Sequence, residues 1–80
     1  MKNKFIYELY PVKTAASRLV LDERMSLVEM QKFVGGHIEV LPYQDGTVLV
    51  FNEEGKIQNL PTNPMFLGLV GNVIKTKDLI

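Results

Sequence analysis

The sequence predicts one α+β domain, in which a small mixed or antiparallel β-sheet carries one main helix on a face. Residues 3–10 are dense in aromatic and β-branched residues, as strands are. Residues 25–36 combine helix-start and helix-stop signals with apolar residues at helical spacing. Residues 37–41 and 47–51 read as two strands on either side of an Asp-Gly turn. A chain of 80 residues has room for a single domain over residues 1–80.

Two strands are expected before the helix. The first covers residues 3–10 and ends at Pro11, which cannot continue a central strand. A weakly patterned connection follows over residues 12–16. Residues 17–22 then predict a second short strand, although residues 14–23 are also compatible with a helical turn.

The main helix has the clearest local signals. Ser26 and Glu29 have the spacing of a capping box, in which each side chain accepts a hydrogen bond from a free backbone N–H at the helix start. Gly35 stands where a left-handed residue ends a helix. The apolar stripe at helical spacing consists of Leu27, Met30, Phe33 and Val34.

A hairpin is predicted after the helix. Residues 37–41 alternate polar and apolar, and Asp45-Gly46 is a strong signal for a two-residue turn. Residues 47–51 are apolar on both faces, which indicates a central strand. A second turn is expected at residues 52–55, with residues 56–57 as a short extension.

The C-terminal part predicts a short second helix and a last strand. Residues 60–64 contain two prolines three positions apart and cannot form regular structure. Asn63 can cap a short helix over residues 65–70. Residues 72–80 then form the last strand, and a grasp-like arrangement is one version of the resulting fold.

Composition excludes several classes of site. The chain has no cysteine and one histidine, His37, so neither a disulfide nor a structural zinc site is expected, and no cofactor is implied. Its nine basic and nine acidic residues are interspersed, without the basic patch that direct nucleic-acid binding requires. No stretch approaches the about 20 apolar residues of a membrane span, and no signal peptide is recognised, so a cytoplasmic protein is expected.

The chemistry available points to binding rather than catalysis. His37 is the natural candidate for a general base, but a histidine at the start of a strand is more typically exposed. Asparagines in tight turns can hold a ligand or the backbone, and tyrosines can stack on a planar ligand or on a neighbouring strand. The candidate ligand-binding residues are His37, Glu39, Tyr43, Asn52, Lys56 and Asn63.

One segment is more apolar than a small core requires. Residues 64–70 are apolar all round, and a chain this short cannot bury such a helix on every side. We therefore expect this segment at a homo-oligomer interface or along an apolar pocket. The candidate interface residues are Met65, Phe66, Leu67, Leu69 and Val70.

Three segments resemble a known family. Residues 34–39 (VGGHIE), 52–56 (NEEGK) and 60–63 (LPTN) are similar to the signature of domain of unknown function 3846, whose members typically read VGGYIE, N(D/E)EG(K/L) and LPxN. His37 departs from the usual tyrosine. The resemblance implies an α+β domain of bacteria, plasmids and phages, and it brings no activity and no catalytic residue.

The leading functional hypothesis is a non-enzymatic, phage- or mobile-element-encoded binding protein of the host cytoplasm. It would antagonise a bacterial defence system by sequestering a nucleotide-derived signal or by blocking a protein. In the first case Arg18, Lys32 and Lys56 would hold the anion, with His37 or a tyrosine on the base.

Two alternatives stay open. One is an accessory interaction domain in replication or regulation, which would bind a protein through a strand edge or through residues 65–70. The other is a small hydrolase that uses His37 with Glu39 or Glu53, because alternation places residues 37 and 39 on one face of a strand.

Overall fold

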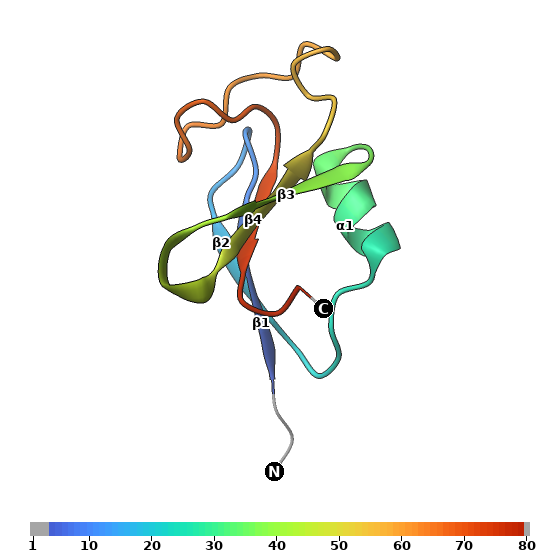
Figure 1. The fold of residues 1–80 in the computed structure, drawn as a ribbon, viewed down its shortest axis with the longest axis vertical. Helices are drawn as coiled ribbons and strands as arrows, with labels where there is room; N and C mark the ends of the chain where they lie inside the picture. The colour runs from blue at the N-terminus through green and yellow to red at the C-terminus, as the bar shows by residue number, and fades with distance from the viewer. Residues whose placement is uncertain (1–3, 80) are drawn as a thin grey trace.

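The computed structural model describes residues 4–79, which form one antiparallel sheet with one α-helix. The sheet order is β2-β1-β5-β4-β3, so β5, the last strand of the chain, lies at the centre (Figure 1). The elements are β1 (Phe5–Tyr10), β2 (Ser17–Leu21), α1 (Leu27–Val34), β3 (Ile38–Pro42), a 3₁₀ turn (Gln44–Gly46), β4 (Val48–Asn52) and β5 (Val73–Thr76).

Two hairpins are joined through this central strand. β1 pairs with β2, β3 pairs with β4, and β5 bridges β1 and β4, always antiparallel. The predicted α+β class is confirmed, and of the two sheet types expected, the antiparallel one is formed. The helical alternative for residues 14–23 is wrong, because Ser17–Leu21 pair along β1.

Helix α1 begins and ends at the predicted signals. Ser26 Oγ accepts from Glu29 N–H, and Glu29 Oε1 accepts from Ser26 N–H, which completes the capping box. Gly35 adopts φ 85°, and its N–H bonds to Gln31 C=O. The apolar stripe contributes Met30 and Val34 to the core, whereas Leu27 in the first turn faces solvent.

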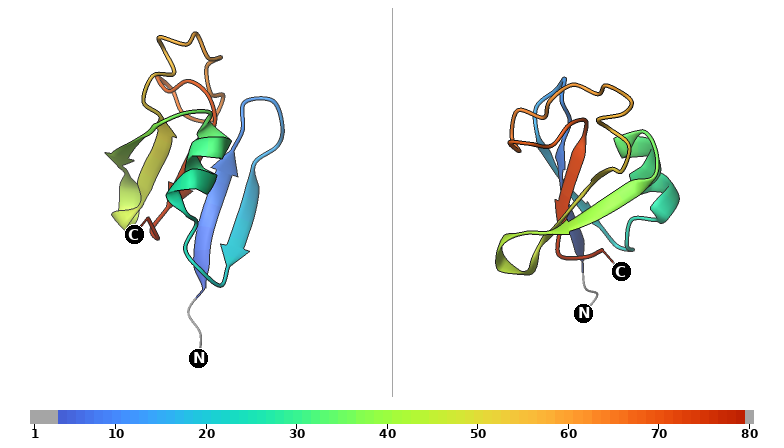
Figure 2. Two further views of the ribbon diagram at one scale, coloured as in Figure 1. Left: turned by 90° about the vertical axis from the view of Figure 1, so that its right-hand side faces the viewer. Right: turned by 45° about the horizontal axis from the view of Figure 1, so that its top comes forward.

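The larger core cluster lies between α1 and the sheet, where Figure 2 shows the helix crossing one face. Its buried members are Tyr7, Met25, Met30, Val50 and Ile74. The Tyr7 hydroxyl accepts from Met25 N–H at 2.9 Å and donates to Asp78 C=O at 2.8 Å. A buried tyrosine needs such partners, and here they fasten the entry to α1 and the segment after β5 onto β1.

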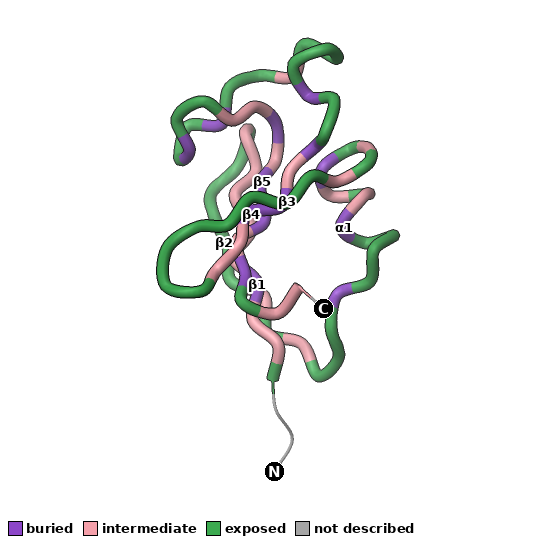
Figure 3. The backbone as a smooth tube through the Cα atoms, in the orientation of Figure 1, coloured by how far each residue is buried: buried purple, intermediate pink, exposed green. Residues whose placement is uncertain are grey.

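The opposite face carries a smaller cluster of Leu49, Phe66 and Val73. It is covered at one end only, by the loop over residues 61–71. Phe66 meets Tyr10 edge-on at 4.9 Å between ring centroids. Figure 3 shows that the loops at this end are mainly exposed, with short buried segments between.

The predicted short second helix is not formed. Residues 64–68 form turns and a bend, and Gly68 at φ 89° lies outside helical geometry. Asn63 still acts as the cap that its type predicts, because Oδ1 accepts from Met65 N–H at 2.9 Å. The chain then returns, and Thr62 forms an isolated bridge with Val70. The loop doubles back on itself where a helix would have continued away.

Three smaller expectations need correction. The Asp45-Gly46 turn is confirmed, with φ of 55° and 75°, but the last strand pair is Pro42↔Val48, so the loop exceeds two residues. Residues 56–57, predicted as a short extension after the turn at residues 52–55, belong to a run of turns. The last strand stops at Thr76, and residues 3 and 80, which we included in strands, lie outside the described residues.

Candidate functional site

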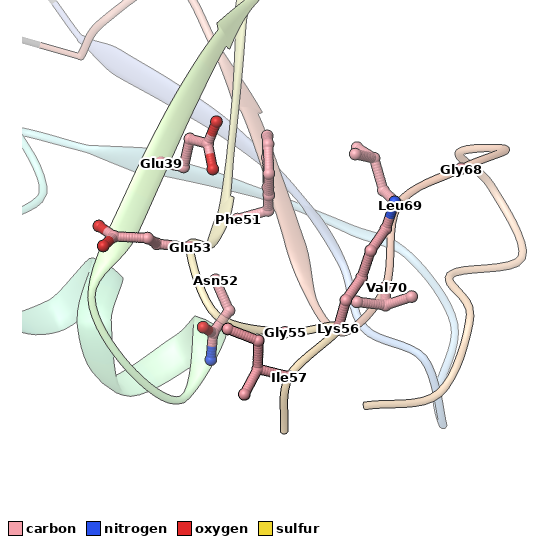
Figure 4. Close-up of a pocket in the computed structure, with 10 residues that line it drawn as sticks. All are labelled: Glu39, Phe51, Asn52, Glu53, Gly55, Lys56, Ile57, Gly68, Leu69 and Val70. Carbon is pink, nitrogen blue, oxygen red and sulfur yellow. The ribbon is translucent and has the colours of Figure 1, made fainter. Parts of the chain in front are cut away.

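A hollow of about 300 Å³ opens at the end of the sheet where β4 leaves it (Figure 4). Three segments build it: the paired strands β3 and β4, the turn after β4, and the loop before β5. Its lining residues are Glu39, Phe51, Asn52, Glu53, Gly55, Lys56, Ile57, Gly68, Leu69 and Val70. Five of these residues belong to the family-like segments 34–39 and 52–56.

The hollow is apolar inside and charged at its edges. Phe51 and Leu69 are half-buried members of the smaller core cluster. Glu39 lies opposite Phe51 in the β3–β4 register, and Figure 4 shows its side chain beside Phe51. On the other side, Lys56 extends along Leu69. A partner group in the hollow would therefore meet apolar surface between one carboxylate and one ammonium.

Asn52 lines the hollow but its amide is already used. Only 3% of Asn52 is exposed; Nδ2 donates to Val34 C=O at 3.2 Å, and Oδ1 accepts from Glu54 N–H at 2.8 Å. A Cβ on Gly36 would lie 3.0 Å from this Nδ2, so only glycine fits there without displacement. Asn52 thus fastens the end of α1 to the turn after β4 instead of presenting an amide to a ligand.

Asn63 has the same kind of role in the second loop. It is 2% exposed, and Nδ2 donates to Tyr10 C=O at 2.8 Å and to Gly71 C=O at 2.9 Å. With the bond from Met65 N–H, the amide closes the loop at both ends and fixes it to β1. Asn63 lies outside the hollow and positions one of its walls.

Glycines allow the two loops to touch. A Cβ on Gly55 would lie 2.7 Å from Val70 Cγ2, and one on Gly71, at φ 77°, would lie 2.8 Å from Leu60 Cδ1. Side chains cannot be accommodated at such distances without movement of the neighbours. Close packing at these glycines therefore adds to the Asn52 and Asn63 hydrogen bonds that hold the family-like segments together.

His37 and Tyr43 lie at opposite ends of β3 and outside the hollow. His37 is exposed, and its carbonyl accepts from Glu53 N–H at 2.9 Å. Tyr43 meets Phe66 edge-on at 5.9 Å, with Lys75 Nζ 5.7 Å from its ring. Of the six predicted ligand residues, the structure gathers Glu39, Asn52 and Lys56 at the hollow.

The predicted interface residues divide into three kinds. Met65 and Leu67 are exposed, Phe66 belongs to the core, and the two remaining residues line the hollow. Sequence reasoning missed Phe51, which it placed in a central strand, and Ile57, which it placed in a short extension after the turn. A lone isoleucine between charged and polar residues of a turn was the signal available for an exposed apolar contact.

The cations predicted to hold an anion do not converge. Lys56 borders the hollow, while Arg18 stands opposite Glu8 in the β1–β2 register. Lys32 lines a separate cavity of about 470 Å³, together with Lys13 and Phe33. None of the described residues that line this second cavity is acidic.

A charged row crosses the sheet face near the smaller core cluster. Glu8 accepts from the Tyr10 hydroxyl at 3.2 Å and lies 3.5 Å from Lys75 Nζ. Burial, and then the neighbouring Glu8 carboxylate, raise the pKa of Tyr10, so its hydroxyl keeps the proton that it donates.

Residues 4–79 carry neither a metal-binding cluster nor a helix that could span a membrane. No group of three His, Cys, Asp or Glu side chains in this range could hold a metal ion. No helix of the same range has the length and apolar character to cross a membrane.

Comparison with known proteins places the chain in a family by its sequence. Neither a curated protein nor a solved structure gives a significant match to it. One family model matches residues 8–79, which covers the whole sheet except the start of β1 and all of the loops described above. The chain therefore belongs to the family described as domain of unknown function (DUF3846).

Proposed function

We propose that this protein is a non-enzymatic binding protein that engages a protein partner through the hollow and the apolar side chains beside it. The observation that carries the proposal is the exposure of Ile57 and Leu67, at 84% and 102% the most exposed large hydrophobic side chains of the described residues. Ile57 lines the hollow, and Leu67 precedes Gly68 in its wall.

Both exposed side chains belong to loops that buried asparagine side chains hold in place. Ile57 follows the turn held by Asn52, and Leu67 stands in the loop closed by Asn63. Because these loops are held by buried hydrogen bonds, little conformational entropy remains to be lost on binding. Fixed apolar side chains around a hollow are typical of a surface that binds another protein.

The charges at the hollow favour a protein over a phosphate-bearing ligand. Of the described residues that line the hollow, Lys56 alone is a cation and the Glu39 carboxylate opposes it, so the lining lacks the cluster of cations that would hold a phosphate group. A partner segment that inserts an apolar side chain and carries a basic residue beside it matches this arrangement.

The fuller form of the proposal concerns the partner. We propose that the chain is encoded by a phage or mobile element and blocks a protein of a bacterial defence system in the host cytoplasm, a role supported by the kind of genome implied by its family resemblance. An accessory role in replication or regulation would use the same surface with a different partner.

Sequestration of a nucleotide-derived signal is the second candidate. Its support is the cavity of about 470 Å³, in which Lys13 and Lys32 accompany apolar Phe33. We expect calorimetric titration with cyclic nucleotides and cyclic ADP-ribose isomers to give flat traces if the protein-binding proposal is right. Binding that is lost in Lys32→Ala and kept in Lys56→Ala would establish the second candidate instead.

Site-specific photocrosslinking in the producing cells tests the main proposal. A photoreactive phenylalanine analogue replaces Ile57 or Leu67, and the matched control replaces Leu27, which is 54% exposed on α1. We expect one protein to be crosslinked from positions 57 and 67 and not from position 27.

The crosslinked protein, once purified, allows a quantitative check. Ile57→Asp should weaken its binding by about tenfold or more, the effect of losing an apolar anchor, whereas Leu27→Asp should leave binding unchanged. Equal crosslinking from position 27, or equal binding by both aspartate variants, would contradict the proposal.

A further inference from the structure

The outer edge of β3 has hydrogen-bonding groups that the sheet does not use. β3 is an edge strand that pairs with β4 alone. Glu53 N–H bonds to His37 C=O, and Tyr43 N–H bonds to Thr47 C=O, which identifies residues 37 and 43 as members of hydrogen-bonded pairs. Because such pairs alternate along an antiparallel ladder, residues 37, 39, 41 and 43 direct their backbone groups toward β4.

The residues between them direct their backbone groups outward. These are Ile38, Val40 and Pro42. Two N–H groups and three C=O groups therefore face away from β4, because proline has no N–H. Val40 is 38% exposed and Pro42 is exposed, so the side chains leave this edge accessible.

We propose that two copies of the chain pair antiparallel through β3, with Val40 opposite Val40 of the second copy. In this register the two Val40 residues exchange both of their bonds, and each Ile38 N–H meets the Pro42 C=O of the other copy. The result is four hydrogen bonds, two at the centre and one at each end. Both outward N–H groups of each copy obtain an acceptor. Because Pro42 has no N–H, the Ile38 C=O opposite it is the one outward carbonyl of each copy that stays without a donor.

The side chains are self-complementary in the same register. On the α1 side, Ile38, Val40 and Pro42 form an apolar row that meets its own equivalent. On the other side, Glu39 falls opposite Leu41, and His37 opposite Tyr43, of the second copy. Like charges directly opposite each other would destabilise the pair, and this register opposes none. The chain as a whole has zero formal net charge, so long-range repulsion does not oppose the contact.

The pairing changes the candidate site. Glu39 lines the hollow, so the second copy would place Leu41 and Tyr43 next to its rim. Two hollows would then lie on one face of a continuous ten-stranded sheet. The inference does not rest on the proposed function, because the edge would pair whatever the hollow binds.

Sedimentation tests whether this edge makes a dimer. Because a contact between two strands is small for a specific interface, we expect a dissociation constant between about 1 μM and 1 mM. Val40→Glu and Val40→Lys each place like charges at the two-fold axis and should weaken the dimer about tenfold or more, while their equimolar mixture should restore it. Val20→Glu, on the opposite edge at β2, is the matched control and should leave dimerisation unchanged.

Disulfide formation tests the register directly. The natural chain has no cysteine, so Val40→Cys introduces the sole thiol. Opposed residues of a hydrogen-bonded pair have Cα atoms about 5.5 Å apart, which a disulfide can span. We expect Val40→Cys to form a covalent dimer on mild oxidation and Val20→Cys to remain monomeric.

Several results would overturn the proposal. A wild-type chain that stays monomeric at about 1 mM has no such dimer. Dimers that persist in both Val40 charge variants use another surface. A Val40→Cys chain that folds, as judged by circular dichroism, but crosslinks no faster than Val20→Cys has a different register or a different partner on this edge.

Discussion

The two faces of the sheet are covered in different ways. Helix α1 covers one face and makes a core with Tyr7, Val50 and Ile74. The loop over residues 61–71 covers part of the other and contributes Phe66. Signals within about ten residues define the helix. The loop is instead held by a hydrogen bond from the Asn63 amide to Tyr10 C=O, and these two residues are 53 positions apart in the sequence. A helix can therefore be recognised from local sequence, whereas an irregular loop that covers a sheet cannot.

This comparison also explains where function is expected. Helix α1 packs on its face, and the cavity of about 470 Å³ lies beside its C-terminal end. The loop covers its face incompletely, and the candidate hollow lies between it and the strands. Loops fixed on a rigid sheet commonly carry binding groups for this reason.

The largest expected effect comes from removing the anchor of the loop. Asn63→Ala removes the side-chain donor to Tyr10 C=O and Gly71 C=O and the acceptor of Met65 N–H, and we expect a loss of about 3 kcal/mol in the free energy of unfolding. Urea denaturation measures it. Leu67→Ala in the same loop is the control and should change stability by less than about 0.5 kcal/mol, because that side chain is in solvent. Equal effects would show that the amide does not hold the loop.

A single hydroxyl provides the corresponding test on the helix face. Tyr7→Phe keeps the ring in the core but leaves Met25 N–H without its acceptor, so we expect a loss of about 1–2 kcal/mol. The change should be smaller than for Asn63→Ala, since apolar packing on this face remains. Thermal unfolding ranks the two variants, and the reverse order would contradict the contrast between the faces.

The helix start should tolerate change better still. Ser26→Ala removes one capping bond of α1, and we expect a loss of about 1 kcal/mol, or roughly 4–8 °C in the melting temperature of a domain this size. Calorimetry checks it. Ser17→Ala, at an exposed position of β2, serves as the control and should leave the melting temperature nearly unchanged.

The smallest expected effect is a pH dependence at the same cap. Hydrogen bonds from Ser26 lower the pKa of Glu29 from its ordinary value of 4.5. The folded state therefore gains stability from ionised Glu29 at pH values above 4.5, and this gain is lost as the pH falls through the lowered pKa. Glu29→Gln should flatten this part of the stability profile and leave the profile above pH 6 parallel to that of the wild type. If Glu29→Gln lost stability below pH 4.5 as steeply as the wild type, Glu29 would not be the group responsible.

Sequence reasoning correctly anticipated the features with local causes. The capping box, Gly35 and the Asp45-Gly46 turn each need only neighbouring residues, and all three are formed. The second helix was predicted because residues 65–70 are apolar and follow a capping residue. The prediction failed because Gly68 adopts a positive φ and Phe66 is drawn onto Tyr10, a contact that depends on the tertiary fold.

The candidate site was predictable only in part. Glu39 was chosen as a carboxylate on the strand face of His37 and Lys56 as a cation for an anionic ligand, and both border the hollow. Asn52 and Asn63 were chosen because an amide in a tight turn can bind a ligand or the backbone; both bind the backbone, whose carbonyl and N–H groups lie within reach of the buried amides. Phe51 was predicted only as part of a central strand, because a strand residue that contributes to both core and site has no sequence pattern of its own.

Hydrogen exchange of the Asn63→Ala variant tests the central claim, that one side-chain amide holds the loop which shapes the candidate site. Gly71 N–H and Asn63 N–H bond within the loop, to Pro61 C=O and Leu69 C=O, and should be protected in the wild type. We expect Asn63→Ala to abolish protection at these two amides while Met30 N–H in α1 loses no more than the fall in global stability explains. Protection that persists in the loop, or falls equally in loop and helix, would contradict the claim.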